Sequence, residues 1–237
     1  MNKCKEFFKF HFLPKRLYLR YSAWNKYRKA EKTQETELRL LPQLVDNTKV
    51  AIDIGANTGL YTFYLSKYAK QVFAFEPHKL FAEFLSKAVA SNVIVINKGV
   101  SNKNTSLPFY VPVKSGRMQM NIASFEKQTA VDWECIKEKV ETVTLDSMQY
   151  KNVGYIKIDV EGHEYEVLEG AVKLISTQKP IVQIEILEIY KDKSKNRSLN
   201  FLMDQGYKIY VYTNNKLNEF NSISPSSMGK NFICIPA

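Results

Sequence analysis

The sequence predicts an α/β fold in which one open sheet carries helices on both faces. Two observations support this prediction. Apolar runs of strand length alternate with helix-period patterns along most of the chain. In addition, residues 50–61, VAIDIGANTGLY, join a buried strand to a helix through a turn that holds Gly55 and Gly59. Small residues in such a turn let a ligand approach the backbone, and the helix N-terminus offers it unpaired N–H groups. We interpret this stretch as the floor of a cofactor site.

Composition and charge indicate one globular domain with a basic arm. The chain has 237 residues, of which 45% are apolar and 24% charged. These values are ordinary for a globular protein. Residues 1–32 contain ten Lys/Arg and two Glu, so they account for most of the net charge of +10. The rest is nearly neutral, which argues against a broad nucleic-acid surface. We expect an arm over residues 1–34 and the main domain over residues 35–237.

The three cysteines, Cys4, Cys135 and Cys234, are scattered and form no C-x-x-C pair. Neither a disulfide framework nor a zinc ribbon is therefore expected, and a cytoplasmic protein is the simplest interpretation. The first fifteen residues, MNKCKEFFKFHFLPK, interrupt their apolar residues with lysines and a histidine. Such a segment matches neither a signal peptide nor a membrane-spanning helix.

The arm combines eleven aromatic or leucine side chains with its basic residues, and Pro14 is expected to divide it into two helical pieces. Two interpretations remain open, and they are compatible. Residues 1–32 can form a peripheral arm that contacts an anionic membrane surface or a partner. They can also be a helical extension that packs its aromatic side chains on the main domain.

The first half of the domain reads as three strand–helix units. A helix is predicted over residues 33–49, and the first strand over Val50–Asp53. A second helix follows, because Leu60, Phe63, Tyr64 and Tyr68 fall on one helix face. The second strand, QVFAF, ends at Glu76, which lies 21 residues after Gly55. At this distance an acidic side chain commonly accepts hydrogen bonds from ribose hydroxyls. A helix over residues 80–88 and a third strand from residue 93 follow.

The second half is less regular. The two prolines of residues 106–113 favour an edge strand or hairpin, residues 114–140 are a candidate lid, and residues 140–145 are a short strand candidate. Residues 155–164, YIKIDVEGHE, predict a strand that ends at Asp159, a tight turn at Gly162 and a helix. A fifth strand over residues 180–186, a helix that ends at Gly206, and an antiparallel pair of residues 207–212 with 231–237 complete the expected sheet.

The glycine turn restricts the kind of ligand. Its spacing is G-x-x-x-G, and Asn57 stands where dinucleotide-binding turns have the glycine that admits a pyrophosphate. This favours a nucleoside ligand without linked phosphates, and S-adenosylmethionine fits. Asp53, at the end of the strand, can accept a hydrogen bond from the ammonium group of such a ligand.

The combination of VAIDIGANTGLY, FAFEP and IKIDVEGHE resembles the FkbM-type methyltransferases. The resemblance covers roughly residues 35–190. It implies a Rossmann-like seven-stranded mixed sheet of order 3-2-1-4-5-7-6, S-adenosylmethionine as cofactor and, for many members, O-methylation of sugar or polyketide hydroxyls. By position it implies that Asp53, Gly55, Asn57 and Gly59 hold the methionine part. It likewise implies that Glu76 holds the ribose and that Asp159 lies beside the reactive methyl.

Methyl transfer to a hydroxyl requires a nearby proton acceptor and exclusion of water. We predict Asp159, Glu161 and His163 as catalytic residues, because they crowd the end of the fourth strand. His163 has the alternative of a solvent-facing residue at a helix start. Asp159 and Glu185 could share a divalent cation, but two carboxylates are too few, and no metal is expected.

The leading hypothesis is an O-methyltransferase that acts on a sugar hydroxyl of a polysaccharide, glycolipid or related small-molecule acceptor. The turn Asp159-Val160-Glu161-Gly162 lacks the Asn/Asp-Pro-Pro-aromatic pattern that enzymes methylating exocyclic amines share, so nucleic acid is a less favoured partner. The alternatives are an RNA methyltransferase, a module that binds RNA or lipid through the basic arm, and an NAD-dependent oxidoreductase.

Overall fold

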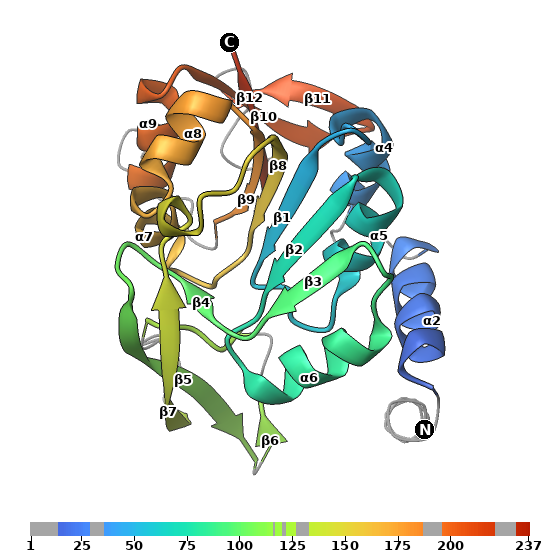
Figure 1. Ribbon diagram of the computed structural model, residues 1–237, viewed down its shortest axis with the longest axis vertical. Helices are drawn as coiled ribbons and strands as arrows, with labels where there is room; N and C mark the ends of the chain where they lie inside the picture. The colour runs from blue at the N-terminus through green and yellow to red at the C-terminus, as the bar shows by residue number, and fades with distance from the viewer. Residues whose placement is uncertain are drawn as a thin grey trace.

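A computed structural model describes residues 14–28, 36–115, 117–119, 122–126, 133–186, 196–220 and 231–237 (Figure 1). An eight-stranded sheet of order β11-β10-β12-β9-β8-β1-β2-β3 forms the centre of the molecule. Its strands are β1 (Val50–Ile54), β2 (Gln71–Phe75), β3 (Val93–Ile96), β8 (Val153–Ile158), β9 (Ile181–Glu185), β10 (Tyr207–Thr213), β11 (Lys216–Glu219) and β12 (Asn231–Pro236).

The predicted α/β architecture is confirmed, with one addition at the edge of the sheet. Strands β3, β2, β1, β8, β9, β12 and β10 reproduce the order 3-2-1-4-5-7-6, and the closing pair β10–β12 is antiparallel as expected. The additional strand is β11, which pairs antiparallel with β10. Asn214 and Asn215 both have positive φ, at 53° and 59°, and form the turn between these strands. Asparagine tolerates this conformation, and consecutive left-handed residues are what a tight hairpin turn requires.

Helices cover both faces of the sheet. One face carries α2 (Lys15–Arg28), α4 (Leu41–Leu44), α5 (Leu60–Tyr68) and α6 (Lys79–Ala88), and the other carries α7 (Glu164–Glu169), α8 (Val172–Gln178) and α9 (Arg197–Asp204). A separate core lies on each face. The helix expected over residues 33–49 is instead a 3₁₀ turn, η1 (Thr36–Leu40), followed by the four residues of α4. Pro42 lacks an N–H group and therefore starts a new helical turn better than it continues one.

The arm packs on the domain, as one of the two interpretations expects. Leu19 and Ala23 of α2 are buried against α5 and α6, and the Tyr18 ring meets the Phe84 ring edge-on at 5.7 Å between centres. The Arg16 guanidinium donates hydrogen bonds of 3.2 and 3.3 Å to the Val89 carbonyl at the end of α6. The helical piece predicted before Pro14 lies outside the described residues. No helix in the described part of the chain is long and apolar enough to cross a membrane.

A second sheet lies beside the first and was not predicted as a unit. Its order is β4-β7-β5-β6, with β4 (Gly99–Val100), β5 (Thr105–Lys114), β6 (Arg117–Met118) and β7 (Glu134–Val143). Residues 106–113, expected to form an edge strand or hairpin, belong to β5, which pairs antiparallel with β7 along its length and with β6 at its end. Strand β7 begins inside the candidate lid. Phe109, Val111, Phe125 and Val140 form a small core under it.

Candidate active site

A pocket lies at the carboxyl ends of β1, β2 and β8, where the second sheet meets the first. Fifteen residues line it: Ile54, Gly55, Asn57, Phe75, Glu76, Pro77, Lys98, Gly99, Val100, Phe109, Ala123, Phe125, Asp159, Val160 and Glu161. Open α/β sheets bind their ligands at this edge. Five of the predicted site residues line this one pocket, namely Gly55, Asn57, Glu76, Asp159 and Glu161.

Gly55 lets the ends of three strands meet at the pocket floor. It has φ of +82°, and a Cβ atom built on it would lie 1.8 Å from the Asp159 carbonyl oxygen. The amides of Gly55 and Ala56 both donate to the Phe75 carbonyl at 3.0 Å. Only glycine satisfies both the positive φ and the close approach of the backbone. The sequence signal of the turn thus has a direct structural cause.

Glu76 lies on the pocket wall with its carboxylate held by the backbone. One of its oxygens accepts a 2.6 Å hydrogen bond from the Asn57 amide, and the other accepts one of 2.8 Å from the His78 amide. Burial raises the pKa of Glu76 to about 7, although these two hydrogen bonds act in the opposite direction. A carboxylate has about four acceptor positions. Two remain available for hydroxyl groups of a ligand.

Asp53 and Gly59 were predicted to contact the cofactor, but the structure places both away from the pocket lining. The Asp53 carboxylate is buried and accepts a 2.5 Å hydrogen bond from the Thr62 hydroxyl, and burial raises its pKa to about 6. Successive side chains of a strand point to opposite faces, so Ile54 faces the pocket and Asp53 faces α5. Gly59 begins α5, and a Cβ atom there would lie 2.3 Å from Leu85 Cδ1, so helix packing accounts for this glycine.

Asp159 lies in the pocket next to a buried cation. Its carboxylate is 32% exposed and lies 3.9 Å from the Lys157 ammonium, which is fully buried. Lys157 also donates to Asn231 Oδ1 at 3.2 Å and lies 4.9 Å from the centre of the Tyr61 ring. The buried ammonium attracts the carboxylate and so restrains its position. Sequence reasoning missed Lys157, although a single lysine inside the apolar run YIKI was a visible signal.

The tight turn predicted at Gly162 is confirmed. Glu161 and Gly162 have φ of +55° and +106°, and the Gly162 amide donates a 2.8 Å hydrogen bond to the Glu164 carboxylate. Burial raises the pKa of Glu164 to about 7. Glu161 lines the pocket together with Asp159, so the turn presents two carboxylates to the same cavity.

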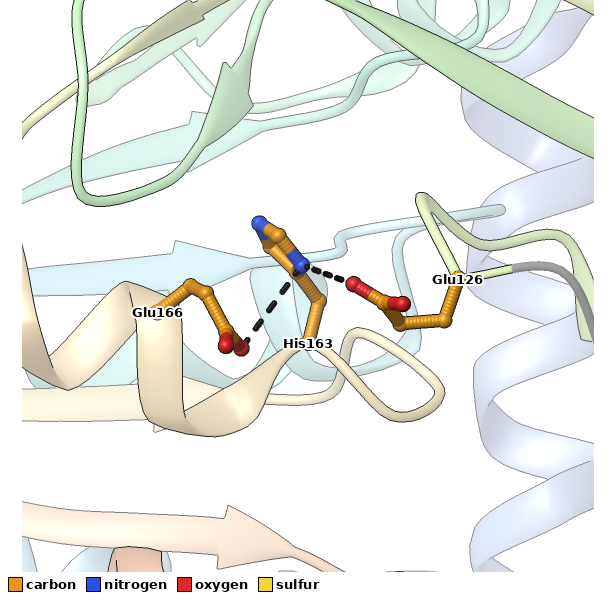
Figure 2. A group of neighbouring side chains, drawn as sticks. All are labelled: Glu126, His163 and Glu166. Atoms are coloured by element: carbon orange, nitrogen blue, oxygen red, sulfur yellow. Dashed lines mark hydrogen bonds and ion pairs between the residues drawn. The ribbon is translucent and has the colours of Figure 1, made fainter.

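His163 is buried, contrary to the alternative of a solvent-facing helix start. Only 4% of the residue is exposed. Its Nδ1 lies 3.0 Å from a Glu126 oxygen (Figure 2). Its Nε2 lies 2.9 Å from Ser101 Oγ, and its ring centre is 5.1 Å from that of Phe125. Phe125 lines the pocket and His163 does not. His163 therefore lies behind the pocket wall, and its predicted catalytic role requires it to act through neighbouring residues.

The pair Asp159 and Glu185 does not form a metal-binding group with a third ligand among the described residues. A group of three potential ligands does occur, and it consists of Glu126, His163 and Glu166.

The sheet order and the pocket at the strand ends are those of a Rossmann-like α/β fold with a ligand site at its topological switch point. The chain belongs to the FkbM methyltransferase family, because the family model described as "Methyltransferase FkbM domain" matches residues 53–209. The predicted family membership is thereby confirmed.

Individual proteins are similar to this chain in sequence or in fold. The hexuronic acid methyltransferase AglP of Haloferax volcanii is 26% identical over 160 residues, which cover 66% of this chain and 62% of that protein. A crystal structure of a methyltransferase FkbM from Methylobacillus flagellatus superposes with a TM-score of 0.50 at 16% identity, covering 80% of this chain and 44% of that chain. A putative rRNA methylase from Clostridium thermocellum also gives 0.50, at 13% identity, covering 86% and 94%. At such identities the two structures show the fold alone.

Proposed function

We propose that this methyltransferase uses S-adenosylmethionine to methylate a hydroxyl group of a sugar, in a polysaccharide, a glycolipid or a related metabolite. The observation that carries the proposal is the position of Glu76. Its backbone-anchored carboxylate lies on the same pocket wall as the glycine turn and Asp159. This is the arrangement that receives a ribose beside a reacting group.

The residues of the pocket suit the chemistry of this cofactor. S-adenosylmethionine supplies an electrophilic methyl group on a sulfonium cation. Three carboxylates line the pocket, from Glu76, Asp159 and Glu161, against a single lysine, Lys98. An acidic, partly enclosed site favours a cationic ligand. In the proposed arrangement the backbone around Gly55 and Asn57 borders the methionine part, and Glu76 accepts hydrogen bonds from the ribose.

The same pocket can hold and activate an acceptor hydroxyl. Asp159, and next to it Glu161, can take the proton that the hydroxyl loses as the new C–O bond forms. Phe109 and Phe125, whose ring centres are 5.1 Å apart, provide an apolar wall on the side of the second sheet. An aromatic wall beside carboxylates suits a sugar, which has both apolar ring faces and hydroxyls. The named activity of the Haloferax relative, on a hexuronic acid, supports a sugar acceptor.

Transfer of labelled methyl groups tests this proposal. Purified protein is incubated with radiolabelled S-adenosylmethionine and separate extracts of the host's glycans, glycolipids and RNA. We expect the label in a glycan or glycolipid fraction. Hydrolysis of that fraction should release the label as the methyl ether of a sugar. Label confined to RNA would instead establish the RNA methyltransferase alternative. Tight binding of NADH with none of S-adenosylmethionine would overturn the proposal in favour of an oxidoreductase.

Glu76→Gln is expected to weaken binding of S-adenosylhomocysteine by about 1–3 kcal/mol, because charge-assisted hydrogen bonds to the ribose become neutral ones. With a pKa near 7, wild-type Glu76 is mostly protonated at pH 6 and mostly ionised at pH 8. If the ligand prefers the carboxylate, affinity in the wild type rises between these pH values, and the Gln variant lacks that part of the rise. Calorimetric titrations at both values provide the measurement.

Glu83→Gln is the matched control, since Glu83 is an exposed glutamate of α6 that pairs with Lys79 at 3.9 Å. It should bind S-adenosylhomocysteine as the wild type does at both pH values. An affinity of Glu76→Gln equal to that of this control would remove Glu76 from the ribose role.

A peripheral membrane contact of the arm is a separate part of the proposal. The outer side of α2 exposes Leu17 and Trp24, each at 52%, with Tyr21 on the same side, and the helix contains no acidic residue. Aromatic and basic side chains together suit the interface of an anionic bilayer. Equal sedimentation of the full chain with neutral and anionic vesicles would count against this contact.

A further inference from the structure

Three potential metal ligands converge behind the pocket wall, outside the residues that the proposed reaction uses. They are His163 at the start of α7, Glu166 one turn later on the same helix, and Glu126 from the segment between β6 and β7 (Figure 2). One donor atom from each lies within 4.8 Å of the other two. Residues three apart on a helix project to the same side, so His163 and Glu166 face Glu126 together.

The two carboxylates of this group favour a bound cation. Nδ1 of the buried imidazole lies 3.0 Å from a Glu126 oxygen and 3.7 Å from a Glu166 oxygen. The other ring nitrogen, Nε2, lies 2.9 Å from the hydroxyl of Ser101, which donates to it or accepts from it according to the ring tautomer. Nδ1 carries at most one proton, so it can share a hydrogen bond with only one of the two carboxylates at a time. A divalent cation among the three groups would balance both negative charges.

We propose that Glu126, His163 and Glu166 bind a divalent transition-metal ion, with Mn²⁺ and Zn²⁺ as the best-suited ions. A nitrogen ligand beside two carboxylate oxygens fits such ions better than Mg²⁺ or Ca²⁺, which prefer oxygen alone. Bonds of about 2.0–2.2 Å separate two ligands of one ion by at most about 4.4 Å. The donor atoms therefore need only small side-chain movements. The contact from Ser101 to Nε2 is the outer hydrogen bond that orients a metal-binding imidazole.

The position of this site gives it a structural effect on the pocket. Glu126 directly follows Phe125, and His163 comes two residues after Glu161, and both Phe125 and Glu161 line the pocket. A shared ion would join the segment that contains Phe125 to the turn that contains Glu161. It would thereby fix these two parts of the pocket wall relative to each other. The site itself does not depend on the proposed methyl transfer, because neither the cofactor nor the acceptor supplies a ligand.

Binding of Mn²⁺ alone tests the inference, on the full chain without an affinity tag and after removal of metal by a chelator. The decrease of the electron paramagnetic resonance signal of free Mn²⁺ should report one ion per chain. Glu126→Gln and Glu166→Gln should each weaken binding by at least about tenfold, since each removes one charged ligand. In the bound complex, electron spin echo modulation from a directly bound imidazole nitrogen is expected.

Glu169→Gln is the matched control, because Glu169 lies on the same helix, is exposed and accepts a hydrogen bond from Asn102 instead of facing the site. Its Mn²⁺ affinity should equal that of the wild type. Circular dichroism melts of all three variants verify that they are folded. Wild-type binding no tighter than about 1 mM would overturn the inference. Equal affinity in the two site variants and the control, or a complex without nitrogen modulation, would do the same. In either case the three residues form a hydrogen-bonded cluster without a metal ion.

Discussion

Asp159→Asn is expected to lower kcat by about 10²- to 10⁴-fold while it changes the affinity for S-adenosylhomocysteine by less than about tenfold. Asparagine has nearly the same shape as aspartate, so it can occupy the same place beside Lys157 and in the turn. It cannot accept the proton that an acceptor hydroxyl loses. The loss should therefore fall on the chemical step, and single-turnover rates with a saturating glycan acceptor, beside calorimetric titration of the product cofactor, would separate the two effects.

Two further variants make this experiment decisive. Asp204→Asn changes an exposed aspartate at the end of α9 that does not line the pocket, and it should leave both quantities unchanged. Glu161→Gln removes the second carboxylate of the pocket. A large loss of kcat in Glu161→Gln with none in Asp159→Asn would assign the proton to Glu161. Equal losses of turnover and of cofactor affinity in Asp159→Asn would make Asp159 part of the cofactor wall.

The parts of the fold that follow from local chain chemistry could be predicted from the sequence. Strand β1, its turn and the start of α5 are encoded in twelve consecutive residues, and the positive φ of Gly55 leaves few alternatives. The spacing to Glu76 likewise reflects one strand–helix–strand unit of ordinary length. The turn and this spacing account for Gly55, Asn57 and Glu76, three of the five predicted residues that line the pocket.

What escaped prediction depends on contacts between distant segments. The β5–β7 ribbon joins residues about thirty apart, across a stretch without a turn signal as plain as Asn-Gly, so its register is not visible in the pattern. His163 is buried because Ser101 and Glu126, which come from two other segments, close over it. Asp53 was predicted to hold the methionine part because it lies at a strand end, and in the structure its carboxylate faces α5 and accepts a hydrogen bond from Thr62.

Gly55→Ala should destabilise the protein by about 3 kcal/mol or more, and it should also weaken binding of S-adenosylhomocysteine. Two costs add in this variant. A non-glycine residue in the left-handed region costs about 1–2 kcal/mol. The new methyl group would also lie 1.8 Å from the Asp159 carbonyl oxygen, so the backbone of β1 or of the β8 turn must move, and overpacking of this kind costs typically about 1–3 kcal/mol. Urea unfolding followed by circular dichroism measures the free energy of unfolding.

Gly162→Ala separates these two costs. Gly162 also has a positive φ, of +106°, but the nearest atoms to an added Cβ are those of the Glu126 side chain at 3.9 Å, an ordinary contact distance. This variant should therefore bear the conformational cost alone, about 1–2 kcal/mol. If Gly55→Ala were no less stable than Gly162→Ala, the contact between Gly55 and the Asp159 carbonyl would not be a fixed feature of the fold. That contact sets where Asp159 lies relative to the glycine turn. A larger loss in Gly55→Ala would therefore tie the stability of the β1–β8 junction to the geometry of the proposed cofactor site.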